Sequence, residues 1–146
     1  MIAQTIQLAL APVFMLVAIG NIMNILSTRL GRVVDRSRIL RDLHASTAGT
    51  DHDAVVREIR MVANRIRIIS HAILLLVASG LTVGLVVAML FIEEIAGLDL
   101  QLAVAGAFMI AISLLMAALV LFIRETRQAT EALQIPDTYL ELERKL

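Results

Sequence analysis

Largely polar side chains recur at seven-residue intervals between residues 7 and 42, and they define the chemistry that this chain could perform. Seven residues are nearly two helical turns, so on a helix these side chains share one face that drifts by about 20° per repeat. Lipid cannot solvate such a face, which must therefore point toward protein or water. If copies of this helix surround a pore, the candidate lining residues are Gln7, Phe14, Asn21, Asn24, Thr28 and Asp35, with Asp42 extending the line.

Three carboxylates lie in the short turn predicted between the second and third apolar segments. They would concentrate cations at the outer mouth of such a pore, so the chemistry that we predict is cation-preferring conduction. An alternative is that Asn21 and Asn24 hydrogen-bond to neighbouring helices in a tight bundle, because amides readily make interhelical contacts in membranes. Both interpretations stay open. The acidic residues of this outer turn are Glu93, Glu94 and Asp99.

Other chemistries have little support in the sequence. The chain has no cysteine, which excludes disulfides, iron–sulfur clusters and thiol nucleophiles. It has no Ser/His/Asp arrangement, no glycine-rich phosphate loop and no HExxH motif, so we expect no enzyme. A net charge of zero and arginines without stacking aromatics argue against a nucleic-acid partner. We predict neither metal nor cofactor, because no recognised ligand spacing accompanies His44, Asp51, His52 and Asp53.

The composition places these residues in a membrane protein. Of 146 residues, 59% are hydrophobic, and the mean hydropathy is +0.85. A soluble domain of this size could not bury so much apolar side chain, so the predicted class is all-α and integral to the membrane. About 20 apolar residues are needed to cross a bilayer. Three segments reach that length, at residues 6–26, 68–92 and 102–123, and Pro12 lies where it could kink or start the first one.

The basic residues predict how the chain is oriented. Nine arginines lie between the first two spans, four further basic residues follow the third span, and the turn between the second and third spans has none. The positive-inside rule therefore places the N-terminus outside and the C-terminus inside. Residues 124–146 become a cytoplasmic tail, with a helical start that Pro136 ends and a short polar stretch from Tyr139 to Leu146.

Residues 28–67 read as a cytoplasmic antiparallel hairpin of two helices that continue from the first two spans. Each helix carries a narrow apolar seam at alternating spacings of four and three, as in coiled coils. The stretch His44 to His52 is predicted to be the loop, with Thr50 or Asp51 as the cap of the next helix. The seams comprise Leu26, Leu30, Val33, Ser37 and Leu40, then Val55, Ile59, Val62, Ile66 and Ile69.

Small residues on the last two spans favour close helix packing. They recur at four-residue spacing, which allows backbones to approach one another. Ordinary packing within one chain would explain them. However, three spans form a thin bundle, and identical surfaces often close into symmetric assemblies, so we also expect a homo-oligomer. The residues are Gly80, Gly84, Ala103, Ala107 and Ala111.

The first helix carries a distinctive set of residues, namely the Ala11-Pro12 step, Asn24, Thr28-Arg29-Leu30 and Val34-Asp35-Arg36. With these as its most specific part, the chain resembles the bacterial membrane family catalogued as domain of unknown function 2721, from residue 6 to about residue 135. The resemblance implies a three-span, multi-pass protein of the bacterial inner membrane, and it implies no activity or catalytic residue.

Two functions follow as hypotheses. The first is a homo-oligomeric, cation-preferring pore lined by the first helix. The second is a non-conducting scaffold whose cytoplasmic hairpin mediates assembly or binds a cytoplasmic protein. Expected partners are membrane lipids, further copies of the chain and, for the pore, a cation.

Overall fold

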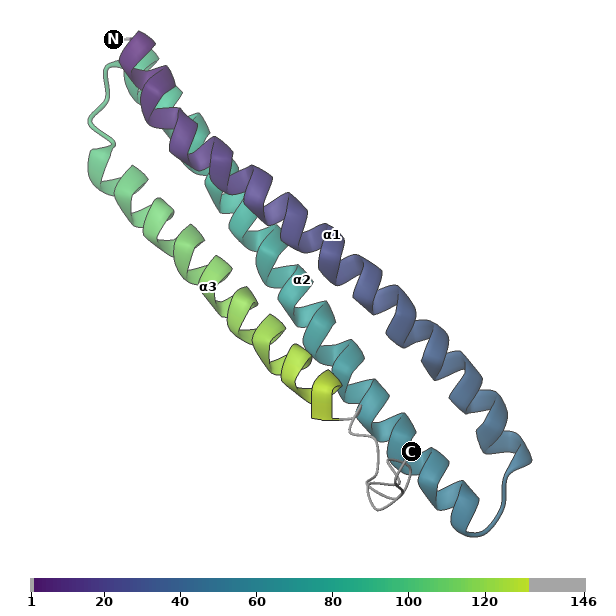
Figure 1. Cartoon of the computed structure of the whole chain (residues 1–146). Coiled ribbons are helices and arrows are strands. Elements are labelled where there is room, and N and C mark those ends of the chain that lie inside the picture. The colour runs from purple at the N-terminus through teal and green to yellow at the C-terminus, as the bar shows by residue number, and fades with distance from the viewer. Residues whose placement is uncertain (1, 132–146) are drawn as a thin grey trace, which may run out of the picture.

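The computed structural model describes residues 2–131, which form three helices and no strand. They are α1 (Ile2–Ser46), α2 (Thr50–Ala96) and α3 (Gln101–Glu131). The helices run alternately in opposite directions, and α2 packs against both of the others (Figure 1). Each helix has a stretch long and apolar enough to cross a membrane, which confirms the all-α, multi-pass class. The predictions for Pro136 and for residues 139–146 lie outside the described residues.

Helices α1 and α2 are unusually long, at 45 and 47 residues, and both extend beyond the end of α3 (Figure 1). Helix α1 begins at Ile2 and passes through Pro12, so the proline does not start the helix. Helix α3 likewise continues without interruption from its apolar stretch to Glu131. Where the membrane boundaries fall along the three helices stays a prediction.

The turn between α1 and α2 is shorter than the sequence pattern predicts. Residues 47–49 alone connect the helices, so the loop predicted from His44 to His52 is wrong. The hydroxyls of Ser46 and Thr47 both donate to the carbonyl of Leu43, which satisfies the end of α1 without unwinding it. Gly49 then reverses the chain with a φ of 67°. Gly49 also occupies the N-cap position of α2 and makes no side-chain cap hydrogen bond, so the cap predicted at Thr50 or Asp51 is wrong.

The core between α1 and α2 follows a strict seven-residue repeat on both helices. A seven-residue apolar repeat keeps one line of each helix facing its partner when the helices coil gently around each other. On α1 the buried line is Thr5, Pro12, Ile19, Leu26, Val33 and Leu40, and on α2 it is Val62, Ile69, Leu76 and Val83. The other residues of the predicted seams, such as Leu30 and Ile59, are half-buried beside this core.

A second line on α2, offset from the first, faces α3 and also repeats every seven residues. Ser79 is fully buried, and its hydroxyl donates to the carbonyl of Ala111 over 2.8 Å. Ala111 and Ala118 are the buried small residues of α3, and they let the two backbones approach closely. The line on α2 comprises Arg65, Ala72, Ser79 and Val86, and the facing line on α3 comprises Ala111, Ala118 and Glu125.

Candidate functional site

The predicted polar line of α1 lies on the side of the helix that faces away from α2. Except for Asn24, each residue of the polar line follows a residue of the buried line by two positions, as Gln7 follows Thr5. Two positions correspond to a rotation of about 200° around an α-helix, so the two lines lie on nearly opposite sides. Phe14 is 69% exposed, and no member of the line is covered by the described part of the chain. The hydroxyl of Thr28 donates to the carbonyl of Asn24 within the helix. The exposed members are Gln7, Phe14, Asn21, Asn24, Thr28, Asp35 and Asp42.

Small residues accompany this polar face. A Cβ atom built on Gly20 or Gly31 would have no described atom within 4 Å, beyond its own helix backbone. Ser27 and Asn24 lie between these glycines at helical spacing and are exposed. Helix α1 therefore presents a narrow, polar and slightly hollowed face to whatever lies beside it. One copy of the chain presents this face but does not enclose a channel, so the pore-lining role of these residues stays a prediction.

A buried ion cluster joins all three helices near the end of α3. The side chain of Glu125 is fully buried, and each of its oxygens meets a different arginine. Nη1 of Arg29 on α1 lies 2.6 Å from Oε2, and Nη2 of Arg65 on α2 lies 2.8 Å from Oε1. Arg29 also donates to the hydroxyl of Thr126, and its guanidinium lies 5.2 Å from the ring centre of Phe122.

The geometry explains why the carboxylate can be buried here. A buried charge is tolerated when it is paired and hydrogen-bonded, and two guanidinium groups satisfy both oxygens of Glu125. The arginine side chains are 34% and 25% exposed, so they can reach solvent or lipid headgroups. Nε of Arg65 is buried without a hydrogen-bond partner among the described residues. The cluster fixes α3 against α1, which α2 otherwise separates (Figure 1).

Sequence reasoning does not find this cluster. The charge pattern assigns Arg29 and Arg65 to membrane orientation, and it gives Glu125 no role. A usable signal is present, because Glu125 continues the seven-residue spacing of Ala111 and Ala118 beyond the apolar stretch. A carboxylate on a buried line requires a basic partner on a facing helix.

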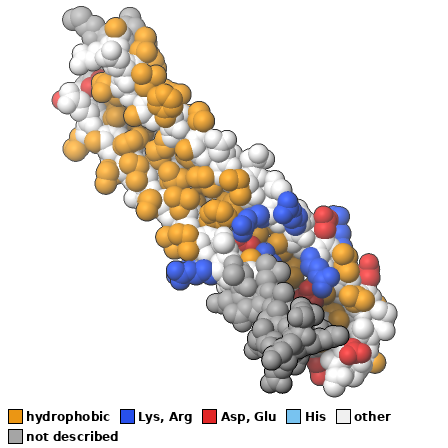
Figure 2. Space-filling model, in the orientation of Figure 1, with side chains coloured by type: hydrophobic (Ala, Val, Ile, Leu, Met, Phe, Trp, Pro, Cys, Tyr) orange, Lys and Arg blue, Asp and Glu red, His pale blue; other side chains and the backbone are white. Residues whose placement is uncertain are grey.

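The charged side chains divide the molecule into two ends. Basic groups, interspersed with acidic ones, gather where α3 ends and beyond it, while the opposite end carries a few acidic groups among apolar side chains and, within the described residues, no Lys or Arg (Figure 2). We call these the basic end and the acidic end. At the basic end, Arg36 and Glu58 form a further pair at 2.7 Å between α1 and α2, and Asn64 donates to Gln128 over 3.2 Å.

The acidic end differs in detail from the predicted turn. Helix α2 continues to Ala96, so Glu93 and Glu94 are helical and the turn itself holds Asp99. Glu94 accepts a hydrogen bond from the hydroxyl of Thr5 on α1 over 3.1 Å. Asp99 accepts from the backbone N–H of Gln101 at the start of α3. The three carboxylates therefore have separate surroundings.

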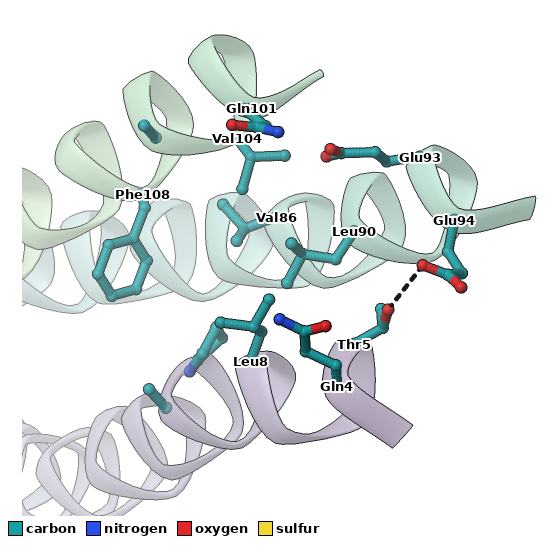
Figure 3. A pocket seen from close by; sticks show the side chains of 13 residues that line it. Gln4, Thr5, Leu8, Val86, Leu90, Glu93, Glu94, Gln101, Val104 and Phe108 are labelled. Carbon is teal, nitrogen blue, oxygen red and sulfur yellow. Dashed lines mark hydrogen bonds between the residues drawn. The ribbon is translucent and has the colours of Figure 1, made fainter. Parts of the chain in front are cut away.

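A cavity of about 640 Å³ opens at the acidic end, between α1 and α3 and over α2 (Figure 3). Its wall is apolar, and its mouth is polar. The wall includes Leu8, Val86, Leu90 and Phe108, and the polar residues are Gln4, Thr5, Glu93, Glu94 and Gln101. Figure 3 shows the carboxylate of Glu93 and the amide of Gln101 on one side of the mouth, with Gln4 across from them.

The small residues of α2 and α3 fall into two groups. A Cβ atom on Gly80 would lie 3.9 Å from side-chain atoms of Leu16 and Ile19, so this glycine faces α1. Ala111 is buried against α2. Gly84 and Ala103 are exposed, and Ala107 is half-buried. Gly80 and Ala111 thus pack against other helices of the same chain. A role in assembly stays a prediction for Gly84, Ala103 and Ala107.

The turn between α1 and α2 brings two histidines together. The rings of His44 and His52 lie 4.5 Å apart between centroids. Within residues 2–131, no three His, Asp or Glu side chains gather in an arrangement that could hold a metal ion.

Three long apolar helices in one chain, with separated basic and acidic ends, define a multi-pass membrane protein. Comparison with known families is more specific. The chain belongs to the family described as "Protein of unknown function (DUF2721)", whose model matches residues 9–135. No curated protein and no solved structure matches the chain.

Proposed function

We propose that copies of this chain assemble in the bacterial inner membrane and that the polar face of α1 lines a cation-preferring pore between them. One observation carries the proposal. Asn21 and Asn24 lie on the apolar part of α1, on a face that neither α2 nor α3 covers. A bilayer core offers amides no hydrogen-bond partner, so this face requires water or another chain.

The length of the polar line favours conduction over a single interhelical contact. One pair of asparagines would suffice to join two helices, whereas this line extends from Gln7 to Asp35. Carboxylates lie near both ends of α1's polar line, as Glu94 and Asp35, and such groups raise the local concentration of cations. Phe14 on the same face would form an apolar constriction, a feature that gates many pores by excluding water.

The proposed orientation places the N-terminus outside, and the paired helices beyond α3 in the cytoplasm. The charge distribution supports it, because the basic end then faces inward. The absence of cysteine allows a direct test with single substitutions. A membrane-impermeant thiol reagent should label Leu98→Cys from outside intact cells and Thr47→Cys only after the membrane is opened. The reverse labelling would overturn the orientation.

Reconstitution in planar bilayers or vesicles tests the pore. The purified wild type should pass cations, and Asn21→Leu should reduce the flux strongly by removing a polar group from the lining. The matched control is Ser113→Leu, since Ser113 is exposed on α3 and bonds to the carbonyl of Met109. Absence of flux at every voltage, pH and membrane tension would contradict the pore, as would equal flux from Asn21→Leu and the wild type.

A non-conducting scaffold is the second candidate, and a different observation favours it. Beyond α3, the paired helices expose the large apolar side chains of Ile39, Leu43 and Met61. Such surfaces suit a protein partner or a neighbouring copy. Replacing residues 36–61 with a short glycine–serine turn removes these three side chains and keeps Arg29, Arg65 and Glu125. Assembly and partner capture should then be lost, and unchanged assembly would count against the scaffold.

A further inference from the structure

We propose that the cavity at the acidic end binds a phospholipid whose headgroup ends in a primary ammonium. Its acyl chain lies between α1 and α3, and its ammonium contacts the carboxylate of Glu93. The proposal is independent of whether α1 lines a pore.

The cavity wall has the chemistry of an acyl-chain site. Leu8, Val86, Leu90 and Phe108 come from three helices and leave an apolar space open on one side (Figure 3). The wall residues belong to helices with apolar stretches long enough to cross a membrane, so in the proposed insertion the open side of the space faces lipid. A cavity of about 640 Å³ is within the range of small-molecule sites.

The size of the cavity favours a lipid chain over a helix from a second copy. A helix with its side chains is about 10–12 Å across and 5.4 Å per turn, so one turn occupies roughly 400–600 Å³. The space would therefore hold about one turn. A helix from a second copy would lie mostly outside a space of one turn, whereas a flexible methylene chain can bend to fill it.

The polar mouth supplies the headgroup contacts. Glu93 is half-buried and has no hydrogen-bond or ion-pair partner within residues 2–131, whereas Glu94 is bonded to Thr5. The segments around the cavity contain no Lys or Arg, so no basic side chain of these segments competes with a cationic ligand group for Glu93. The side-chain amides of Gln4 and Gln101 are donors for the phosphate.

These contacts discriminate between lipid classes. A primary ammonium can donate hydrogen bonds to the Glu93 carboxylate and carries the complementary charge. A quaternary choline group carries the charge without donors, and a glycerol headgroup leaves the phosphate charge uncompensated beside an acidic residue. The order of preference should therefore be ethanolamine, then choline, then glycerol headgroups.

A single tryptophan gives a direct test, because the natural chain has none. Phe108→Trp places the fluorophore in the cavity wall, and Leu102→Trp places it at an 88% exposed position that does not line the cavity. Each full-length variant is reconstituted in vesicles that contain a fixed fraction of brominated phosphatidylethanolamine, phosphatidylcholine or phosphatidylglycerol. The Phe108→Trp variant should be quenched with about a threefold preference for ethanolamine over glycerol headgroups, as expected for one partly exposed ion pair. The Leu102→Trp variant should show no preference.

Two further substitutions in the Phe108→Trp background test the role of the carboxylate. Glu93→Gln should abolish the headgroup preference, whereas Asp99→Asn, which changes a carboxylate outside the cavity, should leave it intact. Equal quenching of the Phe108→Trp variant by all three lipids would overturn the proposal. So would an unquenched fluorophore in Phe108→Trp together with a quenched one in Leu102→Trp, because the cavity would then exclude lipid.

Native mass spectrometry gives a second readout that needs no fluorophore. The wild type and Glu93→Gln are compared after extraction from the same phosphatidylethanolamine-containing membranes. Retention of phosphatidylethanolamine should fall in the variant, and equal retention would also overturn the proposal.

Discussion

Arg29 and Glu125 are 96 residues apart in the sequence, yet Nη1 of the arginine lies 2.6 Å from Oε2 of the glutamate. The contact links α1 directly to α3 across one edge of α2. Arg65 of α2 completes the cluster from the other side of the carboxylate. One fully buried side chain therefore depends on residues from both other helices.

Removing the carboxylate should destabilise the fold. Glu125→Ala leaves two arginines without their shared partner, and breaking a buried ion pair in this way costs about 3–5 kcal/mol. We expect a value near the lower limit, because both arginines are partly exposed. The free energy of unfolding in mixed detergent micelles measures it. Glu58→Ala is the matched control, since its pair with Arg36 is more exposed than the cluster, at 49% and 36%, and should contribute less than about 1 kcal/mol. Equal effects of the two changes would contradict the role of the cluster.

Leu40 should hold the paired helices together beyond α3. It is fully buried, and Leu→Ala changes in packed cores cost about 2–5 kcal/mol. Because α3 does not reach the paired ends of α1 and α2 around Leu40, the loss of stability should be confined to those ends. Hydrogen exchange should rise in residues 36–60 and stay low in the apolar stretches. Ile39→Ala, at the exposed neighbouring position, should change exchange little. Protection that survives in Leu40→Ala would show that other contacts hold this pair.

Ala111 should set the distance between α2 and α3. It is fully buried, and its carbonyl accepts the hydrogen bond from Ser79. Ala111→Leu overfills this contact, and overpacking typically costs about 1–3 kcal/mol. Ala117→Leu makes the same change at an exposed position of the same helix and should be nearly neutral. Thermal unfolding of both variants in detergent measures the difference, and indistinguishable melting temperatures would refute the close packing.

Gly80 should accept a methyl group and reject a larger side chain. The added Cβ would meet Leu16 and Ile19 at 3.9 Å, an ordinary contact, and alanine favours helix over glycine by about 0.5–1 kcal/mol. Gly80→Ala should therefore be neutral or stabilising, and Gly80→Leu destabilising.

Gly84 provides the comparison, because a Cβ atom there meets open space. Gly84→Leu should leave the stability of the single chain unchanged or slightly higher in the same unfolding assay. A loss of stability equal to that of Gly80→Leu would show that both glycines face a helix.

The helices and their apolar faces could be predicted because both follow a local period. Leu26, Val33 and Leu40 repeat every seven residues, so their shared face is visible without knowing what covers it. The end of α1 could not be predicted in the same way. Ser46 and Thr47 are typical of loops, and their hydroxyls stabilise the helix end only once the chain reverses at Gly49.

The buried cluster could not be predicted because its signal is not local. An arginine next to an apolar stretch has the same neighbours in sequence whether it contacts lipid phosphates or a distant carboxylate. Arg29 and Arg65 resemble the other arginines between the first two spans in this respect. The cavity at the acidic end is also invisible in the sequence, because it depends on how far α3 diverges from α1.

The order of the helices along the chain has a consequence for biosynthesis. Helices α1 and α2 share a continuous core, so they can pair as soon as both have left the ribosome. At that moment, Arg29 and Arg65 face each other without the carboxylate that separates their charges. Glu125 arrives last, near the end of α3, and its insertion both neutralises this repulsion and docks the third helix. A nascent chain that stops before Glu125 therefore keeps two unmatched charges beside the membrane, which distinguishes it electrostatically from the finished protein.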